Sequence, residues 1–291
     1  MTENKVRQKR RDKMITIDKI SSPLIMGIIN LNNDSFYEGS RCSTDEEFCL
    51  RYEKLLSEGA DIIDLGACST RPGSIPVSEE EEWERLKPAL KRVLLNYPES
   101  EISIDTFRSS IVLRAFDFVG DFIINDISAG EDDPDMLKMA SRLELPYIAM
   151  HKRGTPENMQ TMCDYENVTL TVREYFEDFI NRATEAGIKD IIIDPGFGFA
   201  KNLDQNYKLL REMDNLKIER GNSGKYYPIL AGLSRKSMIY KLLEKDPSDV
   251  LHATSALNLT ALINGASILR VHDVKEASEI VKIYKKLTEK A

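Results

Sequence analysis

The chain has 291 residues, of which 42% are hydrophobic and 30% charged, and its formal net charge is −8. These values are typical of a soluble globular protein, and the negative charge argues against a general nucleic-acid-binding surface. No apolar run approaches the roughly 18 residues that a membrane span requires, so we expect no membrane association.

The N-terminal segment, MTENKVRQKRRDK, is basic, and no apolar segment of signal-peptide length follows it. We expect residues 1–20 to form a flexible, solvated arm and residues 21–291 to form one catalytic domain. The four cysteines form no CxxC pair, and the chain has only three histidines, which argues against a zinc site. Scattered cysteines fit a reducing cytoplasm, which is the location we expect.

Apolar runs and helical patterns alternate along the whole chain, with no linker between them. The predicted strands are at 24–29, 61–65, 102–104, 121–124, 146–150, 190–193, 227–232 and 267–272. The predicted helices are at 43–57, 77–97, 109–118, 135–143, 168–186, 203–216, 238–243, 248–263 and 274–288.

This alternation predicts an α/β fold with a parallel sheet. The run Ile191-Ile192-Ile193 is β-branched and continuous, as in strands that are covered on both faces. Eight strand–helix units in under 300 residues favour a closed, eight-stranded (β/α)8 TIM barrel. An open, doubly wound sheet is the alternative.

In such a barrel the C-terminal ends of all strands share one rim, where loops carry the chemistry. Polar residues stand at every predicted strand end. They are Asn30, Thr70 with Arg71, Asp105, Asn125, His151, Asp194, the run 234–237, and Arg270 with His272. Loop polarity explains each of them alone, but it explains all eight ends together less well.

One group at the rim suits a flat heterocycle with adjacent N–H and NH2 donors, namely Asp105, Asn125, Asp194 and Lys236. Asp194 could instead bind the amides of its own loop, DPGFGF, and Lys236 could simply pair with a carboxylate. If Asp194 accepts from a ligand, the ring of Phe197 or Phe199 could cover it.

A second group suits an anion such as diphosphate, namely Asn30, Arg71, Arg270 and His272, for which no compensating carboxylate is evident. Asn30 could also bind magnesium through its carbonyl. Ser237 opens a helix and could hold a ligand carboxylate or act as an ordinary N-cap. Cys68 lies at the rim without a cue that lowers its pKa, and we interpret it as a packing residue.

The rim segments MGIINLNNDSFYEG, DIIDLGACSTRPGS, ISIDT, IINDISAG, MHKRGTPENMQ, DPGFGFAKN, GLSRKSMI and ILRVHDV resemble the successive motifs of the dihydropteroate synthase family. They stand in the family's order between about residues 24 and 275. The resemblance implies a TIM-barrel transferase of folate biosynthesis that condenses 6-hydroxymethyl-7,8-dihydropterin diphosphate with p-aminobenzoate and releases diphosphate. It also implies a magnesium cofactor, a homodimer, and sulfonamide inhibitors that occupy the p-aminobenzoate site.

The resemblance assigns roles by motif. The implied pterin-binding residues are Thr70, Asp105, Asn125, Asp194, Phe199 and Lys236. The implied diphosphate-binding residues are Asn30, Arg71, Arg270 and His272, with Asn30 also on the metal. The implied p-aminobenzoate-binding residues are Phe36, Pro72 and Ser237. The implied catalytic residues are Asp34, Arg71, Lys236 and Arg270.

The sequence departs from the family pattern at two places. Asn32-Asn33 stands where Thr-Pro is usual, and Ala67-Cys68 stands where Gly-Glu is usual. These departures bear on loop stiffness and on the response to sulfonamides. Two other functions stay open, a pterin-binding domain of a methyltransferase and a pterin-binding protein without activity.

Overall fold

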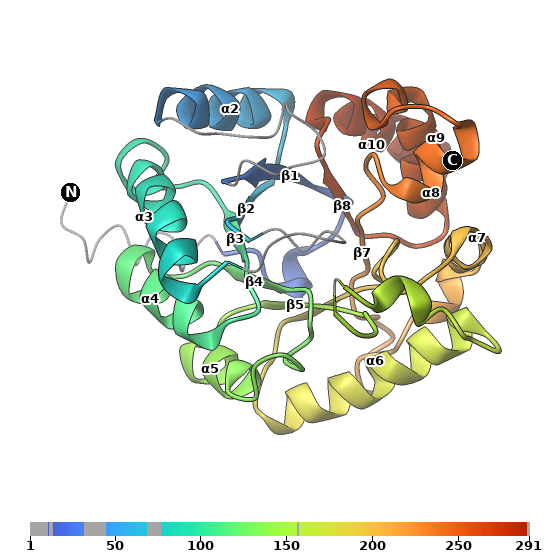
Figure 1. Ribbon diagram of the computed structural model, residues 1–291, viewed down its shortest axis with the longest axis horizontal. Helices are drawn as coiled ribbons and strands as arrows, with labels where there is room; N and C mark the ends of the chain where they lie inside the picture. The colour runs from blue at the N-terminus through green and yellow to red at the C-terminus, as the bar shows by residue number, and fades with distance from the viewer. Residues whose placement is uncertain (1–10, 12–13, 32–44, 69–76, 156, 290–291) are drawn as a thin grey trace.

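The computed structural model describes residues 11, 14–31, 45–68, 77–155 and 157–289 (Figure 1). The strands run in chain order from β1 to β8. Their bounds are β1 Leu24–Asn30, β2 Ile62–Gly66, β3 Ile102–Asp105, β4 Ile123–Asp126, β5 Tyr147–Met150, β6 Ile191–Asp194, β7 Leu230–Ala231 and β8 Ile268–Val271.

The strands form one parallel sheet that closes on itself. Hydrogen-bonded neighbours follow the order β6-β5-β4-β3-β2-β1-β8-β7. A parallel bridge between Ile193 and Ile229, one residue before β7, joins the two ends of this order. The predicted (β/α)8 TIM barrel is therefore confirmed, and the open sheet is wrong.

Helices surround the strands on the outside (Figure 1). Their bounds are α2 Asp45–Glu58, α3 Glu79–Asn96, α4 Ser109–Val119, α5 Met136–Leu143, α6 Val168–Glu185, α7 Leu203–Arg211, α8 Ser237–Leu243, α9 Leu251–Ile263 and α10 Val274–Thr288. Short 3-10 turns lie at η1 Ile17–Lys19, η3 Met159–Thr161, η4 Met213–Leu216 and η5 Pro247–Asp249. Within the described ranges, none of the helices is both long and apolar enough to span a bilayer.

Local signals set the helix starts. The Ser78 side chain accepts from the Glu81 amide, and the first turn of α3 is acidic, which complements the helix dipole. Asn202 and Gln205 form a reciprocal capping box at the start of α7.

Two elements differ most from the sequence prediction, and both are shorter than expected. The helix expected over 203–216 ends at Arg211 and continues as η4. The strand expected over 227–232 is reduced to Leu230–Ala231. Pro228 has no N–H to donate to the ladder, although its carbonyl accepts from the Ile193 amide.

The N-terminal end of the barrel is filled by one apolar layer. Its residues are Met26, Ile62, Ile123, Ile148, Ile192, Leu230 and Ile268, together with Ile17 of η1. The Ile17 amide donates to Asp190 Oδ1 at 2.9 Å, and the Ile15 amide donates to Glu101 Oε2 at 3.2 Å. Residues 14–20 therefore lie against the barrel, in contrast to the free arm that we expected over 1–20.

We predict that Ile17→Ala lowers the free energy of unfolding by about 2 kcal/mol, since it removes a buried side chain from the barrel base. Urea unfolding measures this change. Leu50→Ala on the exposed face of α2 is the control and should leave stability unchanged. Equal stability of the Ile17→Ala variant and the wild type would show that residues 14–20 do not pack on the barrel in solution.

Candidate active site

Polar side chains point into the barrel directly above the apolar base layer. Successive side chains of a strand point to opposite faces, so a residue two positions after a base residue points into the barrel as well. Two residues beyond Ile62, Ile123, Ile192 and Ile268 of the base layer stand Asp64, Asn125, Asp194 and Arg270. The layer above the apolar base is therefore polar.

Asp64 is the centre of this polar layer, and it is fully buried. Its carboxylate accepts from Ser103 Oγ on β3, and from Asn125 Nδ2 on β4 at 3.2 and 3.3 Å. It also accepts from Arg270 Nε on β8 at 2.7 Å. Asp64 thus binds side chains from three strands, and it is not among the site residues predicted from the sequence.

Arg270 bridges two carboxylates. Besides Asp64, its guanidinium donates to Asp105 Oδ2 at 2.8 Å. Burial acts to lower the pKa of Arg270, but Asp64 and Asp105 raise it above its ordinary value. The prediction that Arg270 lacks a compensating carboxylate is therefore wrong, because sequence distance hid both partners.

Two opposing effects act on the pKa of Asp105, namely burial and its ion pair with Arg270. Burial raises the pKa of Asp105 to about 7, against the lowering effect of Arg270 and with a further rise from Asp64. This carboxyl group can therefore gain or lose a proton near neutral pH.

Asp194 and Lys236 form the opposite part of the mouth. Asp194 Oδ1 accepts from the Gly196 amide at 2.8 Å, so one of its oxygens binds its own loop, as one of the two interpretations predicted. Lys236 Nζ donates to the Phe197 carbonyl and lies 4.9 Å from the centroid of the Phe199 ring. Burial lowers the pKa of Lys236 to about 8, although Asp194 acts to raise it.

Glycines stand beside both parts of the mouth. A Cβ at Gly232 would lie in ordinary contact, 3.8 Å from both Asp194 Oδ2 and Lys236 Nζ. A Cβ at Gly66 would lie 3.6 Å from Asp105 Oδ2 and 3.8 Å from Asn30 Oδ1. Asn30 therefore points to the same part of the mouth as Asp105.

His272 is oriented by Ser234. The His272 amide donates to Ser234 Oγ at 3.2 Å, and the ring atom Nδ1 lies 3.0 Å from the same oxygen. The Ser234 hydroxyl therefore fixes the orientation of the imidazole ring.

Ser237 is the first residue of α8, and Lys236 occupies the N-cap position without a capping side-chain bond. The interpretation of Ser237 as the N-cap is therefore wrong. The segment is fixed by buried Arg235, which has a φ of 55° and binds Asp273 through Nε and NH2 at 2.8 and 2.9 Å.

Asp34, Phe36, Thr70, Arg71 and Pro72 lie outside the described residues. Arg108 contacts the described residues on either side of the range 69–76. It donates to Cys68 Sγ at 3.4 Å and to the Val77 carbonyl at 2.6 Å. Burial and the nearby Glu82 raise the pKa of the Cys68 thiol, which disfavours the nucleophilic thiolate and fits a packing residue.

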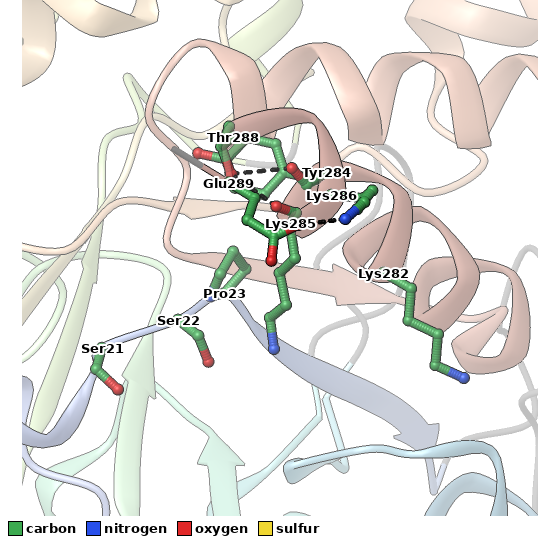
Figure 2. A pocket seen from close by; sticks show the side chains of 9 residues that line it. All are labelled: Ser21, Ser22, Pro23, Lys282, Tyr284, Lys285, Lys286, Thr288 and Glu289. Carbon is green, nitrogen blue, oxygen red and sulfur yellow. Dashed lines mark hydrogen bonds and ion pairs between the residues drawn. The ribbon is translucent and has the colours of Figure 1, made fainter. Parts of the chain in front are cut away.

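A groove of about 550 Å³ lies at the opposite end of the barrel, lined by Ser21–Pro23 and the last turns of α10 (Figure 2). Its lysines, Lys282, Lys285 and Lys286, stand near the C-terminus of α10, where positive charge offsets the helix dipole. The groove shares no residue with the mouth.

The mouth offers few metal ligands of its own. Among the described residues, no group of three or more His, Cys, Asp or Glu side chains could hold a metal ion. Asn30 offers one carbonyl oxygen near Asp105, and magnesium is commonly held by one or two protein ligands together with substrate phosphates. This donor set fits magnesium that arrives with a phosphorylated substrate and does not fit a closed metal centre.

A (β/α)8 barrel with carboxylates, an amide and cations at the C-terminal ends of its strands belongs to the class of TIM-barrel proteins that bind a small polar ligand at this mouth. The model of the pterin binding enzyme family matches residues 26–272. The dihydropteroate synthase of Haemophilus influenzae is 40% identical over 267 residues, which cover 91% of this chain and 94% of that protein. The Escherichia coli K12 dihydropteroate synthase is 39% identical over 91% of each chain.

Solved structures agree with these relatives. The Yersinia pestis dihydropteroate synthase in complex with a sulfonamide drug has a TM-score of 0.84 and 35% identity, covering 92% of this chain and 95% of that one. The Burkholderia cenocepacia dihydropteroate synthase complexed with 7,8-dihydropteroate has a TM-score of 0.79 and 34% identity, covering 92% of each chain. The chain belongs to the pterin binding enzyme family, among the dihydropteroate synthases.

We predict that Asp64→Ala lowers the free energy of unfolding by about 3 kcal/mol, because it leaves the partly buried Arg270 guanidinium with one carboxylate and the Asn125 amide without its acceptor. Ser103→Ala, which keeps the ion pair, should cost about 1 kcal/mol. Urea unfolding followed by the fluorescence of buried Trp83 measures both changes. Glu279→Ala on the exposed face of α10 is the control, and an equally small effect of Asp64→Ala would contradict the central place of Asp64.

Proposed function

We propose that the protein condenses 6-hydroxymethyl-7,8-dihydropterin diphosphate with p-aminobenzoate in the cytoplasm, giving 7,8-dihydropteroate and diphosphate in folate biosynthesis. The observation that carries this proposal is the polar layer above the apolar barrel base. Relatives with the same fold bind 7,8-dihydropteroate, 4-aminobenzoic acid and sulfonamides. The sulfonamides would take the place of p-aminobenzoate here.

The orientation of Asn125 supports a pterin at this position. Asp64 accepts from Asn125 Nδ2, so the amide oxygen of Asn125 is the end left to face a ligand. Asp194 Oδ1 accepts from Gly196, so Oδ2 is the oxygen nearer to Lys236 and Gly232. Asn125 and Asp194 then offer two acceptors for the adjacent N–H and NH2 groups of the pterin, while Lys236 offers a donor. Asp105, Phe199 and Thr70 complete the proposed pterin site.

The charge at the mouth supports magnesium. Among the described residues, the carboxyl groups of Asp64, Asp105 and Asp194 are matched by three nearby basic groups, Arg270, Lys236 and Lys201. A diphosphate brings further negative charge, and Arg270 is already paired with carboxylates. Asn30 would hold Mg²⁺, which supplies the missing positive charge and polarises the leaving group when bound.

The reaction uses the same groups in succession. Asn30, Arg71, Arg270 and His272 would hold the diphosphate while the bond from oxygen to the pterin methylene breaks. The positive charge that then develops on the pterin is stabilised by the carboxylates of Asp105 and Asp194. The amine of p-aminobenzoate, placed by Phe36, Pro72 and Ser237, adds to the methylene and loses a proton. Since an arylamine is a sufficient nucleophile for a cation, no strong general base is required, and Asp34 and Lys236 would position the reacting groups.

The proposed function is tested by the release of diphosphate from the pterin diphosphate, p-aminobenzoate and Mg²⁺. We expect release that requires all three, and binding of p-aminobenzoate only after the pterin site is filled. Binding of the pterin without release in the presence of p-aminobenzoate would instead support a methyltransferase domain or an inactive pterin-binding protein.

We predict that Arg270→Gln lowers kcat by at least about 100-fold, because the guanidinium acts on the departing anion. The affinity for 6-hydroxymethylpterin, which has no diphosphate, should fall less than about tenfold. Steady-state kinetics and calorimetry give the two values. Equal losses of turnover and pterin affinity would count against this role of Arg270.

We also propose a homodimer that is formed through the outer face of α9. This helix has no Asp, Glu, Lys or Arg, and its outer positions Ala256, Leu259 and Ile263 follow a helical spacing. An uncharged helix with apolar residues at exposed outer positions is typical of a protein interface, which a second copy would provide.

We predict that Ile263→Glu converts the dimer to a monomer, because an unpaired charge in the interface raises the dissociation constant by about 100-fold or more. Sedimentation velocity measures the oligomeric state. Leu95→Glu on α3 is the matched control, since Leu95 and Ile263 are 63% and 60% exposed and the helices α3 and α9 lie on opposite sides of the barrel (Figure 1). An Ile263→Glu protein that stays dimeric would place the interface elsewhere.

A further inference from the structure

A buried lysine that contacts no reacting group in the proposed reaction belongs to the loop between β6 and α7. Lys201 is only 3% exposed. Its ammonium lies 2.9 Å from His151 Nδ1 and 3.0 Å from each of the carbonyl oxygens of Gly196 and Phe199. An ammonium has three protons, so these three acceptors satisfy it completely.

The loop that Lys201 contacts has an unusual backbone. Gly196, Gly198 and Ala200 have φ angles of 68°, 85° and 49°, so every second residue lies in the left-handed region. Gly196 is required there, since a Cβ would lie 2.0 Å from the His151 carbonyl. Two lysines bind the loop carbonyls, Lys201 at positions 196 and 199 and Lys236 at Phe197. The loop conformation therefore depends on cations that lie beneath it and beside it.

The third acceptor, His151, is fixed independently of the loop. Its ring lies edge-on to Tyr175 of α6, with centroids 4.9 Å apart at 89°. Burial, followed by the charge of Lys201, lowers the pKa of His151, so the imidazole stays neutral and Nδ1 can accept. Lys201 is thus bound by His151, which packs on α6, and in turn binds the loop carbonyls of Gly196 and Phe199.

We propose that Lys201 is a positioning residue for the pterin site. Its ammonium holds the loop 195–200 so that the Gly196 amide reaches Asp194 and the Phe199 ring lies beside Lys236, and it thereby sets the affinity for the pterin ring. This role rests on the proposed function, in which Asp194, Phe199 and Lys236 contact that ring.

The test compares Lys201→Met with Lys152→Met. Lys152 is the matched control, because it is also a buried lysine in a neighbouring loop, and its ammonium pairs with Asp132 instead of with the loop 195–200. We expect Lys201→Met to raise the dissociation constant for the pterin by about tenfold or more, as the loss of charged hydrogen bonds frees the loop. The KM for p-aminobenzoate at saturating pterin should change less than about twofold, and Lys152→Met should change either value less than about twofold.

Chemical rescue separates positioning from a general loss of stability. In Lys201→Ala, added ethylammonium can supply N–H donors to the vacated space, and tetramethylammonium, which has none, cannot. We expect ethylammonium alone to restore pterin affinity. Wild-type pterin affinity in Lys201→Met would overturn the positioning role. A loss of affinity that neither ammonium ion restores, and that parallels a loss of folded protein measured by circular dichroism, would overturn it as well. Failure of the proposed function is distinguishable, since the wild type would then release no diphosphate.

Discussion

The ion-paired bridge from Arg270 to Asp64 and Asp105 is the interaction on which the mouth of this barrel depends. It joins β8 to β2 and β3 through residues that are 206 and 165 positions apart in the chain. Buried charges of this kind are costly unless every partner is present. Asp64 meets this condition, because it also accepts from Ser103 and Asn125. The bridge therefore fixes three strand ends relative to one another, and it fixes which end of the Asn125 amide faces the substrate.

The same bridge shapes the electrostatics of the proposed reaction. In the proposed reaction Arg270 would direct a positive charge toward the leaving group, but Asp64 and Asp105 compensate that charge in the protein itself. The described residues of the mouth are thus close to neutral in total charge. Such a site stabilises a pterin ring that becomes cationic better than it binds a diphosphate without a metal ion. Magnesium and a carboxyl group whose pKa is about 7, that of Asp105, are two means by which such a site can accept the charges of its substrate.

The hydrophobic periodicity and the alternation of strands and helices in the sequence were sufficient to predict the barrel and most of the residues at its mouth. Asp105, Asn125, Asp194 and Arg270 stand in the last residues of their strands and Lys236 stands at the start of α8, and parallel strands bring these positions together. Asp64 escaped notice because it lies inside the run IIDLG, where only the strand register shows that it points into the barrel. Lys201 escaped notice because its partners are mainly backbone carbonyls, and sequence patterns do not predict left-handed residues such as Ala200.

The central claim is that Asp64 and the DPGFGF loop present two acceptors, from Asn125 and Asp194, to one pterin ring. A crystal structure of the protein with bound 7,8-dihydropteroate tests this claim most directly. We expect the ring nitrogens within roughly 3 Å of Asn125 Oδ1 and Asp194 Oδ2, with Asn125 Nδ2 still on Asp64. A ring bound away from these two side chains, or an Asn125 amide turned with its nitrogen toward the ring, would contradict the account.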